Sequence, residues 1–478
     1  MSLRSKRELG ALLVLGALTG LISSAATQQR AGQESGIVAV GPEVDVSSEP
    51  GVQSQVSIAV DPTDNRVLVA GSGNWGRKTR AYSSTDGGVS WTTSANPPLP
   101  PGVPRPCAFG DSTVAIDRLS RQYYGFIVGR SCDLEHLGDG VGAPELFVAR
   151  RSSALSAWTT PTRPVAALFA GDALRRGEAD DKPWLAVDVS SESAHTNRVY
   201  LAWTRSGGAE NIRVLVSHSD DGARTWSTPV RVNDRPLANG AIAGIAVGPE
   251  GNVYVVWDDI AARTISIARS TDGGRHFDRT RQVTHERAGR SASCNPPGTS
   301  IPAQPRRCVT ANAYVTVDNS SRHYAGRVYV SYADAGQNLG DDVFVAAFDS
   351  RLRPIGAKLV NPPDGSTLSD QFQPSAAVDS STGTLWVCFY DTSGNPRRSQ
   401  ATYSCTTSDD GADSWSRPLC AASVASDEAE RGANRIGYGD YQGLAVAGGL
   451  AHPIWTDSRA LGTLKEEIYS ATLTGLTA

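Results

Sequence analysis

The sequence lacks the short motifs that mark several common enzyme classes. It has no His-Glu-x-x-His zinc motif, no Gly-x-Ser-x-Gly turn for a serine nucleophile and no phosphate-binding Gly-x-x-x-x-Gly-Lys loop. Zinc-peptidase, serine-hydrolase and nucleotide-binding chemistry are therefore unsupported. Only seven histidines occur, and no two cysteines are spaced as Cys-x-x-Cys, which argues against a zinc site.

Long apolar runs are also absent, apart from one near the N-terminus. Residues 11–22 form an apolar run of 12, which follows a basic start and precedes small residues. A membrane span needs about 20 residues, so this run is typical of a secretory signal. We expect residues 1–26 to be a signal peptide and 27–36 a flexible segment. The chain would then be secreted, to the extracellular space or periplasm, with an uncleaved anchor as the alternative.

Positive charge is in slight deficit. The formal net charge is −4, and it becomes −6 when three basic residues and one acidic residue leave with residues 1–26. A mildly acidic surface argues against nucleic acid or an anionic membrane as a partner. We expect a monomer that does not insert into a membrane.

Export predicts disulfides among the seven cysteines, because secretory compartments are oxidising. Cys107–Cys132 and Cys294–Cys308 are the pairs that we favour. One cysteine of the remaining three would be left over, with Cys405 the shared neighbour of Cys388 and Cys420.

An internal repeat predicts the architecture. A short strand pattern that ends on Val or Ile occurs seven times, and the residues that follow it are 56 to 71 positions apart: Asp61, Asp117, Asp188, Gly248, Asp318, Asp379 and Ala447. Each is followed by a turn and a second apolar strand, such as residues 199–203, 253–257, 328–332 and 385–390. These intervals fit four-stranded blades and predict an all-β, seven-bladed β-propeller over residues 37–478.

The third strand of the repeat leads into a Ser-x-Asp-x-Gly-x-x-Trp turn. It occurs at residues 84–91, at 270–277 with Phe277 in place of Trp, and at 219–226 and 408–415 with Ala223 and Ala412 in the usual glycine position. Asp accepts backbone hydrogen bonds in tight turns, so we interpret these as hairpin locks. The turns resemble those of the BNR/Asp-box repeat family, which includes the sialidases. That resemblance implies a propeller whose boxes lie away from the active site, and six blades is the competing count because sialidases have six.

The last repeat stops one strand short. Residues 37–46 are strand-like, precede the first repeat and have no blade of their own. We predict that they pair with residues 467–473 and close the ring, since closure removes exposed strand edges.

A functional face is predicted where first strands begin and second strands end. Eight carboxylates occupy these positions: Asp111, Asp181, Asp370 and Asp440 before first strands, and Asp258, Asp334, Asp391 and Asp457 after second strands. Other polar or aromatic side chains share these positions: Lys182, Trp184, Arg205, Gln371, Gln373, Tyr441, Gln442 and Arg459. The phrases that hold them resemble those of exported bacterial proteins described as sialidase-like.

Neighbouring carboxylates can split into an acid and a base or nucleophile for glycoside cleavage. Asp440 and Asp457 are the first candidate pair, and Asp370 and Asp391 the second. From the resemblance, Tyr441 is a candidate nucleophile.

Substrate contacts are expected from the remaining side chains of this face. Arg459 could hold a substrate carboxylate and Trp184 could stack on a sugar. Asp181, Lys182, Arg205 and Gln373 complete the expected binding face.

The resemblance to sialidases is incomplete. Those enzymes clamp the sialate carboxylate with three arginines, the first in an Arg-Ile-Pro phrase, whereas residues 53–57 here are Gln-Ser-Gln-Val-Ser. Arg306 and Arg307 do not lie at the matching repeat position. Three hypotheses stay open: a glycoside hydrolase, a glycan- or protein-binding propeller without chemistry, and a scaffold whose acidic mouth holds Ca²⁺. Each Asp also has a purely structural interpretation as a turn cap or ion-pair partner.

Overall fold

In the computed structural model the chain consists of two compact units, Met1–Glu34 and Ser35–Ala478. The structure describes only part of the second unit. These residues are 36–74, 78–103, 106–108, 110–129, 144–164, 178–207, 212–235, 237, 243–288, 298–336, 340–361, 368–429, 436–459 and 464–475. They contain strands and turns and no helix, so none of the described residues forms a helix that could cross a membrane.

Most strands belong to four-stranded antiparallel sheets in which chain neighbours are hydrogen-bonded neighbours. Four sheets have this plain order. They are β11–β14 (Ala179–Val187, Val199–Ser206, Arg213–Ser219, Val230–Arg231), β15–β18 (Ala243–Val247, Val253–Asp259, Thr264–Ser270, Arg281–His285), β21–β24 (Tyr314–Val317, Val328–Ala335, Asp341–Phe348, Pro354–Leu359) and β25–β28 (Gln371–Val378, Leu385–Asp391, Thr402–Ser408, Leu419–Cys420). The predicted second strands lie in β12, β16, β22 and β26.

Three further groups of strands complete the described fold. One sheet contains β7 (Cys107–Ala108), β8 (Thr113–Ile116), β9 (Gln122–Gly129) and β10 (Glu145–Arg151). Another contains β3 (Gly51–Val60), β4 (Leu68–Asn74), β5 (Lys78–Ser84) and β6 (Thr92–Ser94), and it is joined to β29 (Gly443–Ala447), β30 (Leu450–Asp457) and β31 (Leu464–Ser470). A small hairpin, β19 (Thr299–Ile301) and β20 (Gln304–Val309), stands outside the repeat.

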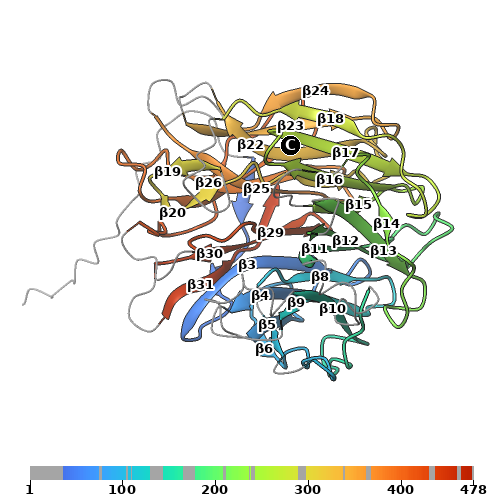
Figure 1. Ribbon diagram of the computed structural model, residues 1–478. Coiled ribbons are helices and arrows are strands. Elements are labelled where there is room, and N and C mark those ends of the chain that lie inside the picture. The colour runs from blue at the N-terminus through green and yellow to red at the C-terminus, as the bar shows by residue number, and fades with distance from the viewer. Residues whose placement is uncertain are drawn as a thin grey trace, which may run out of the picture. The chain divides into compact units, whose positions relative to one another are not determined.

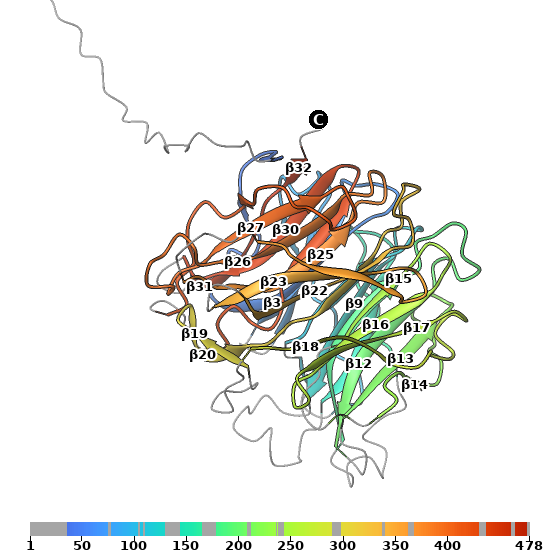
Figure 2. The same ribbon diagram turned by 90° about the horizontal axis from the view of Figure 1, so that it is seen from above.

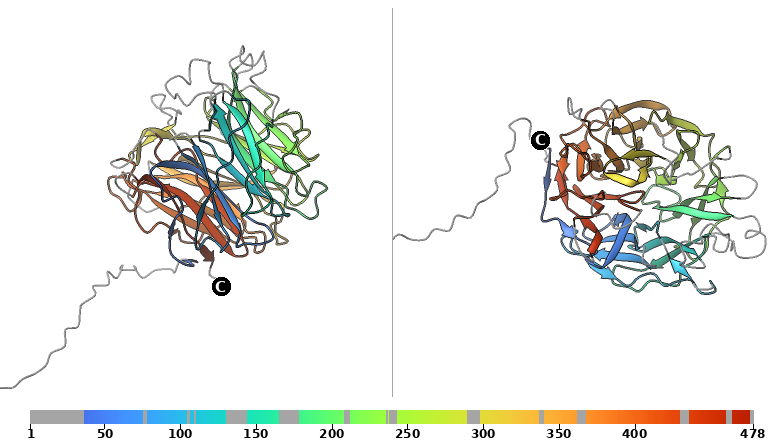
Figure 3. Two further views of the ribbon diagram at one scale, coloured as in Figure 1. Left: turned by 90° about the horizontal axis from the view of Figure 1, so that it is seen from below. Right: turned by 60° about the vertical axis from the view of Figure 1, so that its left-hand side comes forward.

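The first strands of successive sheets contact one another in chain order. β3 contacts β8, and the series continues through β11, β15, β21, β25 and β29, which contacts β3 again. Figure 1 shows the strands of β3 and β31 side by side, and in the right-hand view of Figure 3 the sheets follow one another around a common centre from blue to red.

Hydrophobic clusters fill the spaces between adjacent sheets. Trp203 of β12 packs with β9, and Trp257 of β16 packs with β12. Trp455 of β30 packs with β26. All three indoles are fully buried. The strands that carry them are buried on both faces, which explains why their sequences are continuously apolar rather than alternating.

The N-terminal segment pairs with the end of the chain, as predicted. In β2 (Val44–Asp45), Val44 lies opposite Ser470 of β31 in antiparallel register. β1 (Ile37–Ala39) pairs with β32 (Leu473–Gly475), which Figure 2 shows near the C-terminus. The next residues of the N-terminal segment enter β3, which runs parallel to β31.

The predicted hairpin locks are present as hydrogen-bonded turns. In the turn after β27, the Ser408 hydroxyl donates to Asp410 at 2.8 Å and accepts the Ala412 amide at 2.9 Å. Asp410 Oδ1 also accepts the amides of Asp413 and Ser414. Ala412 adopts a positive φ of 73°, which explains why glycine is common at this position.

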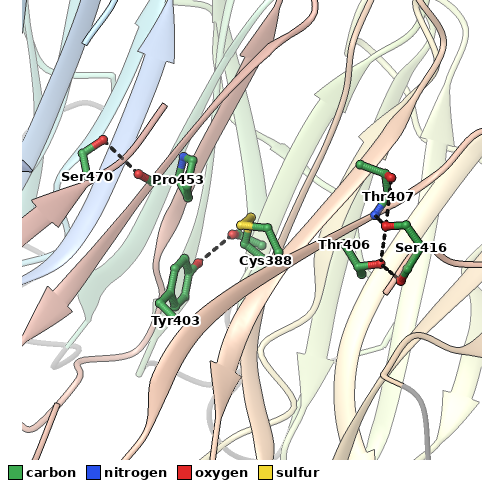
Figure 4. Close-up of a disulfide and its surroundings, with 9 residues drawn as sticks. Cys388, Tyr403, Thr406, Thr407, Ser416, Pro453 and Ser470 are labelled. Carbon is green, nitrogen blue, oxygen red and sulfur yellow. Dashed lines mark hydrogen bonds between the residues drawn. A yellow bond between two sulfur atoms is a disulfide. The ribbon is translucent and has the colours of Figure 1, made fainter. Parts of the chain in front are cut away.

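One disulfide is described in full. Cys388 and Cys405 lie opposite each other on β26 and β27, 4.0 Å apart at Cα, and form a disulfide (Figure 4), whereas Cys420 is free. Cys107 and Cys308 are also disulfide-bonded. Their predicted partners, Cys132 and Cys294, lie outside the described residues.

Candidate functional site

Several first strands contain, or closely follow, a residue in the left-handed backbone region at the same repeat position. Gln55, Asp111, Lys182, Asn312 and Gln373 have φ values of 55°, 50°, 53°, 49° and 49°. Each stands six positions before the Asp that follows its first strand. Non-glycine residues rarely adopt such φ values, and they concentrate where a structure positions functional groups.

These irregular positions bring side chains from several sheets together. We call Gln55, Asp111, Asp181, Lys182, Arg307 and Asp440 the hub cluster. Its centre is the Lys182 ammonium, whose Nζ lies 3.0 and 3.1 Å from the two oxygens of Asp111 and 2.8 Å from Asp440 Oδ2. The nearest oxygens of Asp111 and Asp440 therefore lie within 5.8 Å of each other, which is the sum of two of these distances. Asp181 is 3.9 Å from the same nitrogen.

Asp440 is the most strongly held carboxylate of the cluster. Arg307 donates to its Oδ1 from Nε at 2.9 Å and from a second guanidinium nitrogen. Gln55 donates to its Oδ2 at 2.8 Å. Gln55 also accepts the Asp111 amide at 3.3 Å, so the first strands β3, β8 and β11 are linked to the segment before β29.

The carboxyl groups of Asp111 and Asp440 have opposite electrostatic environments. Burial alone would raise the pKa of Asp440, but Arg307 and Lys182 together hold that pKa well below its usual range. Burial raises the pKa of Asp111, and the carboxylates of Asp181 and Asp440 raise it further against the opposing effect of Lys182. The two groups therefore favour different protonation states near neutral pH.

Solvent reaches the hub cluster through three of its side chains. The side chain of Asp181 is 50% exposed, that of Lys182 is 17% exposed and that of Arg307 is 13% exposed. Asp111 and Asp440 lie behind them and are almost completely buried. A ligand that approaches the cluster would meet Asp181, Lys182 and Arg307 first.

Aromatic rings line the cluster. The half-buried Trp184 ring stands edge-on to Tyr314 and Tyr441, with centroids 4.8 and 5.2 Å away. The Tyr441 hydroxyl donates to the Ser112 carbonyl at 3.1 Å, and the side chain is buried. Burial and the nearby Asp111 raise the pKa of Tyr441 well above its usual value, so it remains a neutral phenol. The candidate nucleophile Tyr441 is thus a buried phenol whose hydroxyl is already bound to the backbone.

The predicted pair of Asp440 and Asp457 is divided between two sets of partners. Asp457 accepts hydrogen bonds from the Arg459 amide at 2.8 Å and from Arg459 Nη2 at 2.5 Å. Arg459 also binds Glu43 of the N-terminal segment at 2.6 Å. Among the described residues, Asp440 and Asp457 share no partner. Arg459 therefore links the N-terminal segment to β30. Its guanidinium is occupied by Glu43 and Asp457 and is not free for the predicted substrate carboxylate.

Other predicted residues are also held by neighbours. Asp370 is fully buried and paired with Arg398, and Asp391 accepts a hydrogen bond from Gln371 at 2.7 Å. Arg205 forms a two-point ion pair with Asp180, at 2.7 and 2.8 Å. Asp370 and Asp391 therefore do not form an open carboxylate pair, and Arg205 does not face a ligand.

Gln373 has a positioning role. Its Nε2 donates to the Gly439 carbonyl at 2.6 Å, and its Oε1 accepts Gln442 Nε2 at 2.9 Å. These bonds fix the segment that carries Asp440. Gln373 thus acts on the cluster through the backbone rather than by direct contact.

The sequence reasoning missed Arg307 and Gln55 and gave Asp111 no role. Arg307 lies on β20, outside the repeat, so no repeat position could identify it. Gln55, Asp111 and Lys182 share one repeat position, six residues before a strand-end Asp, and that spacing was a usable signal.

A metal ion has no built site among the described residues, where no three His, Cys, Asp or Glu side chains are arranged to hold one. In the hub cluster the Lys182 ammonium occupies the space between Asp111 and Asp440 that a cation would otherwise take. The residues present therefore do not fit the Ca²⁺ considered from the sequence.

Comparison with known proteins gives a fold likeness without sequence support. No family model matches the chain, and no curated protein matches its sequence. Two structures of a PL25 polysaccharide lyase, an ulvan lyase, one of them bound to -[GlcA(1-4)Rha3S]-, align with TM-scores of 0.51 at 9% and 10% identity. Each alignment covers 91% of this chain and 96% of the lyase.

Glycan-active proteins recur among the weaker matches. The GH93 α-L-arabinofuranosidase of Fusarium graminearum, in complex with arabinobiose, aligns with a TM-score of 0.46 at 10% identity over 92% of this chain and 98% of its own. The Hadza microbial sialidase Hz136 aligns with a TM-score of 0.45 at 12% identity over 85% and 73%. At such identities the lyase match shows the fold alone, and these two weaker matches carry no argument.

Proposed function

We propose that residues 37–478 form a secreted, seven-bladed β-propeller of the Asp-box, sialidase-like kind. Three observations support seven blades: seven first strands in mutual contact, the return contact from β29 to β3, and hydrophobic clusters between successive sheets. The disulfide Cys388–Cys405 supports export to an oxidising compartment after loss of residues 1–26. The alternative of six blades would leave one of these first strands without a sheet of its own.

We further propose that the protein acts on glycans as a glycoside hydrolase, with the hub cluster as its site. The observation that carries this proposal is the geometry of the carboxylates: Asp111 and Asp440 share the Lys182 ammonium, Arg307 binds Asp440, and Asp181 stands 3.9 Å from the same ammonium, an arrangement that shifts the pKa values of Asp111 and Asp440 in opposite directions. Titratable neighbours whose pKa values are pushed apart are the usual basis of acid and base roles. Glycoside cleavage needs one protonated carboxyl and one carboxylate.

The roles follow from exposure and charge. The neutral Asp111 carboxyl donates a proton to the glycosidic oxygen, and the half-exposed Asp181 carboxylate activates water or attacks the sugar. Asp440 stays ionised and fixes Lys182 and Arg307. Trp184, beside the cluster, offers a ring face to a sugar. Lys182 and Arg307 donate hydrogen bonds to substrate hydroxyl or acid groups.

Turnover tests this assignment directly. The mature chain is assayed on a broad panel of aryl glycosides and oligosaccharides, together with Asp111→Asn and Asp181→Asn. Each substitution is expected to lower kcat by about 100-fold or more, because loss of an acid or base costs roughly 10²–10⁴ in rate. Asp391→Asn, a strand-end Asp outside the cluster, is the matched control and should retain activity.

A folded wild-type protein with no turnover on the whole panel would refute the hydrolase assignment.

A second candidate function is glycan binding without chemistry. It is favoured by the occupancy of both Asp440 oxygens and by the burial of Asp111. It predicts saturable binding on a glycan array without product, and this binding should be weakened by Lys182→Met. An empty array would remove it.

A further inference from the structure

A cavity of about 620 Å³ lies between two neighbouring sheets, outside the hub cluster. The sheets are β11–β14 and β15–β18, which lie side by side in Figures 1 and 2 and share a hydrophobic cluster. We call this space the side cavity. Its lining comes from the residues after β14, from β16, β17 and β18, and from the turns beside them. The volume is within the range of roughly 300–1,000 Å³ that small-molecule sites occupy.

The floor of the side cavity carries an indole N–H group without an acceptor. Trp257 of β16 lines the cavity and is 1% exposed. By contrast, the buried indole of Trp203 donates to Asp180 at 2.9 Å. The buried indole of Trp455 donates to Asp457 at 3.2 Å. The Trp257 N–H donates to no described residue, and it is not among the polar atoms that the fold seals from solvent without a partner. It therefore keeps its donor open to the cavity.

Ser266 places a hydroxyl beside this indole. It belongs to β17 and lies directly opposite Trp257 in the antiparallel register, so the two side chains leave the sheet on the same face. Ser266 is buried and lines the side cavity, and within the described part of the chain its hydroxyl has no hydrogen-bond partner. At the same register of the preceding sheet, Leu215 lies opposite Trp203. The hydroxyl thus replaces an apolar side chain and brings a donor and an acceptor to the floor.

Charged groups of both signs stand around this floor. Arg235 and Arg279 line the side cavity, are exposed and form no ion pair with a carboxylate that the structure describes. Asp234 and Asp259 line it as well. Each of these aspartates gives one oxygen to a backbone amide, at 2.9 and 3.0 Å, and keeps the other oxygen open. The two positive and two negative charges cancel, so the lining favours a ligand without net charge.

Asp234 also holds the two sheets together at the edge of the cavity. Its carboxylate accepts the Thr280 amide at 2.9 Å, and its own amide donates to the Thr280 hydroxyl at 3.4 Å. Asp234 follows β14 of one sheet, and Thr280 precedes β18 of the next. The walls of the cavity are therefore fixed before a ligand arrives, which lowers the entropy cost of binding.

We propose that the side cavity binds a neutral sugar unit of a glycan, with the Trp257 N–H and the Ser266 hydroxyl as its buried contacts. Hydroxyl groups both donate and accept, which matches a lining of indole N–H, serine hydroxyl, guanidinium groups and open carboxylate oxygens. An acidic sugar would need a lining with net positive charge, and an ammonium compound one with net negative charge. No hub-cluster residue lines this cavity, so the site does not depend on glycan cleavage at the hub cluster.

Indole N–H signals test this proposal at the site itself. The chain has ten tryptophans, and ¹⁵N labelling of the indoles gives one NMR signal for each. The Trp257 signal is the one that Trp257→Phe removes. We expect it to shift saturably when methyl β-glucopyranoside, methyl β-galactopyranoside or methyl α-mannopyranoside is added. Ser266→Ala should weaken this binding by about threefold or more, because it removes one hydrogen bond to the sugar.

Two control variants separate the side cavity from other effects. Trp415→Phe removes an indole N–H that is buried without a partner elsewhere, and it should leave the sugar-induced shift of the Trp257 signal unchanged. Lys182→Met, in the hub cluster, should also leave this shift unchanged, so that failure here and failure of the proposed function are distinguishable. The remaining indole signals report whether each variant is folded.

Three results would overturn the proposal. The first is a Trp257 signal that none of the three sugars moves in the folded protein. The second is a signal that moves only with methyl β-glucuronide, an acid, or with L-serine, a zwitterion. The third is sugar binding that Ser266→Ala leaves unaltered.

Discussion

Glu467 of β31 contacts the N-terminal segment, and we expect it to make the stability of this contact depend on pH. Its side chain has no exposed surface, and its Oε2 accepts the Ser47 hydroxyl at 2.5 Å and the Glu49 amide at 3.2 Å. Its other oxygen is buried and lacks a partner among the described residues. Burial raises the pKa of Glu467 from 4.5 to about 7, and Asp45 and Glu49 add to the rise against the opposing hydrogen bonds.

The direction of the pH effect follows from this shift. Below about pH 4.5 the carboxyl is protonated in both the folded and unfolded chains, so it costs nothing. Between about 4.5 and 7 the unfolded chain releases the proton and the folded chain keeps it, so the free energy of unfolding falls as pH rises. The full shift corresponds to about 3 kcal/mol. Relaxation of the structure and water penetration around a buried charge reduce such costs, so we expect about 1–2 kcal/mol.

Glu467→Gln removes this titration and keeps an oxygen for Ser47 and Glu49. Urea unfolding of wild type and variant at about pH 5 and about pH 8 measures the effect through the midpoints and m-values. The variant should be more stable than wild type by about 1–2 kcal/mol at the higher pH, with near-equal stability at the lower pH. Glu192→Gln, at an exposed position, is the control. Parallel pH profiles for wild type and Glu467→Gln would show that the reasoning about this contact is wrong.

Two further predictions concern the disulfide and the hairpin locks. Replacement of both Cys388 and Cys405 by serine should lower the free energy of unfolding by about 3 kcal/mol in urea, since the bond closes a loop of 17 residues. Cys420→Ser should change stability little and should remove one free thiol from a labelling assay of the unfolded chain, and an unchanged thiol count would contradict the pairing. Asp410→Ala should cost about 1–3 kcal/mol because two backbone amides lose their acceptor, whereas Asp409→Ala, beside it, is the control, and equal effects of the two would contradict the turn network.

Local sequence signals predicted the strands and turns well. The apolar second strands, the Ser-x-Asp turns and the strand-like residues 37–46 lie where their patterns placed them, because each depends on contacts within a sheet or a few residues along the chain. Even the pairing of Val44 with Ser470 could be inferred, since the last repeat lacked one strand.

The candidate site was predicted in part. The repeat brought Asp181, Lys182 and Asp440 to one place, as expected, although Asp181 and Lys182 lie within β11 rather than before it. It could not show that Asp457 pairs with Arg459 and Glu43, or that Asp370 pairs with Arg398, because ion-pair partners are chosen by side-chain distances across loops. Arg307 reaches Asp440 from a hairpin that belongs to no repeat.

The sequence by itself determined the all-β character, the repeated unit and the use of the N-terminal segment beside the last strand. These depend on strand period and turn chemistry, which are local. Only the tertiary structure decided which carboxylates gather around Lys182 and which are neutralised by arginines elsewhere. Charges separated by more than a hundred residues interact only when the sheets have assembled, and small shifts at each first strand then set their distances and their pKa values.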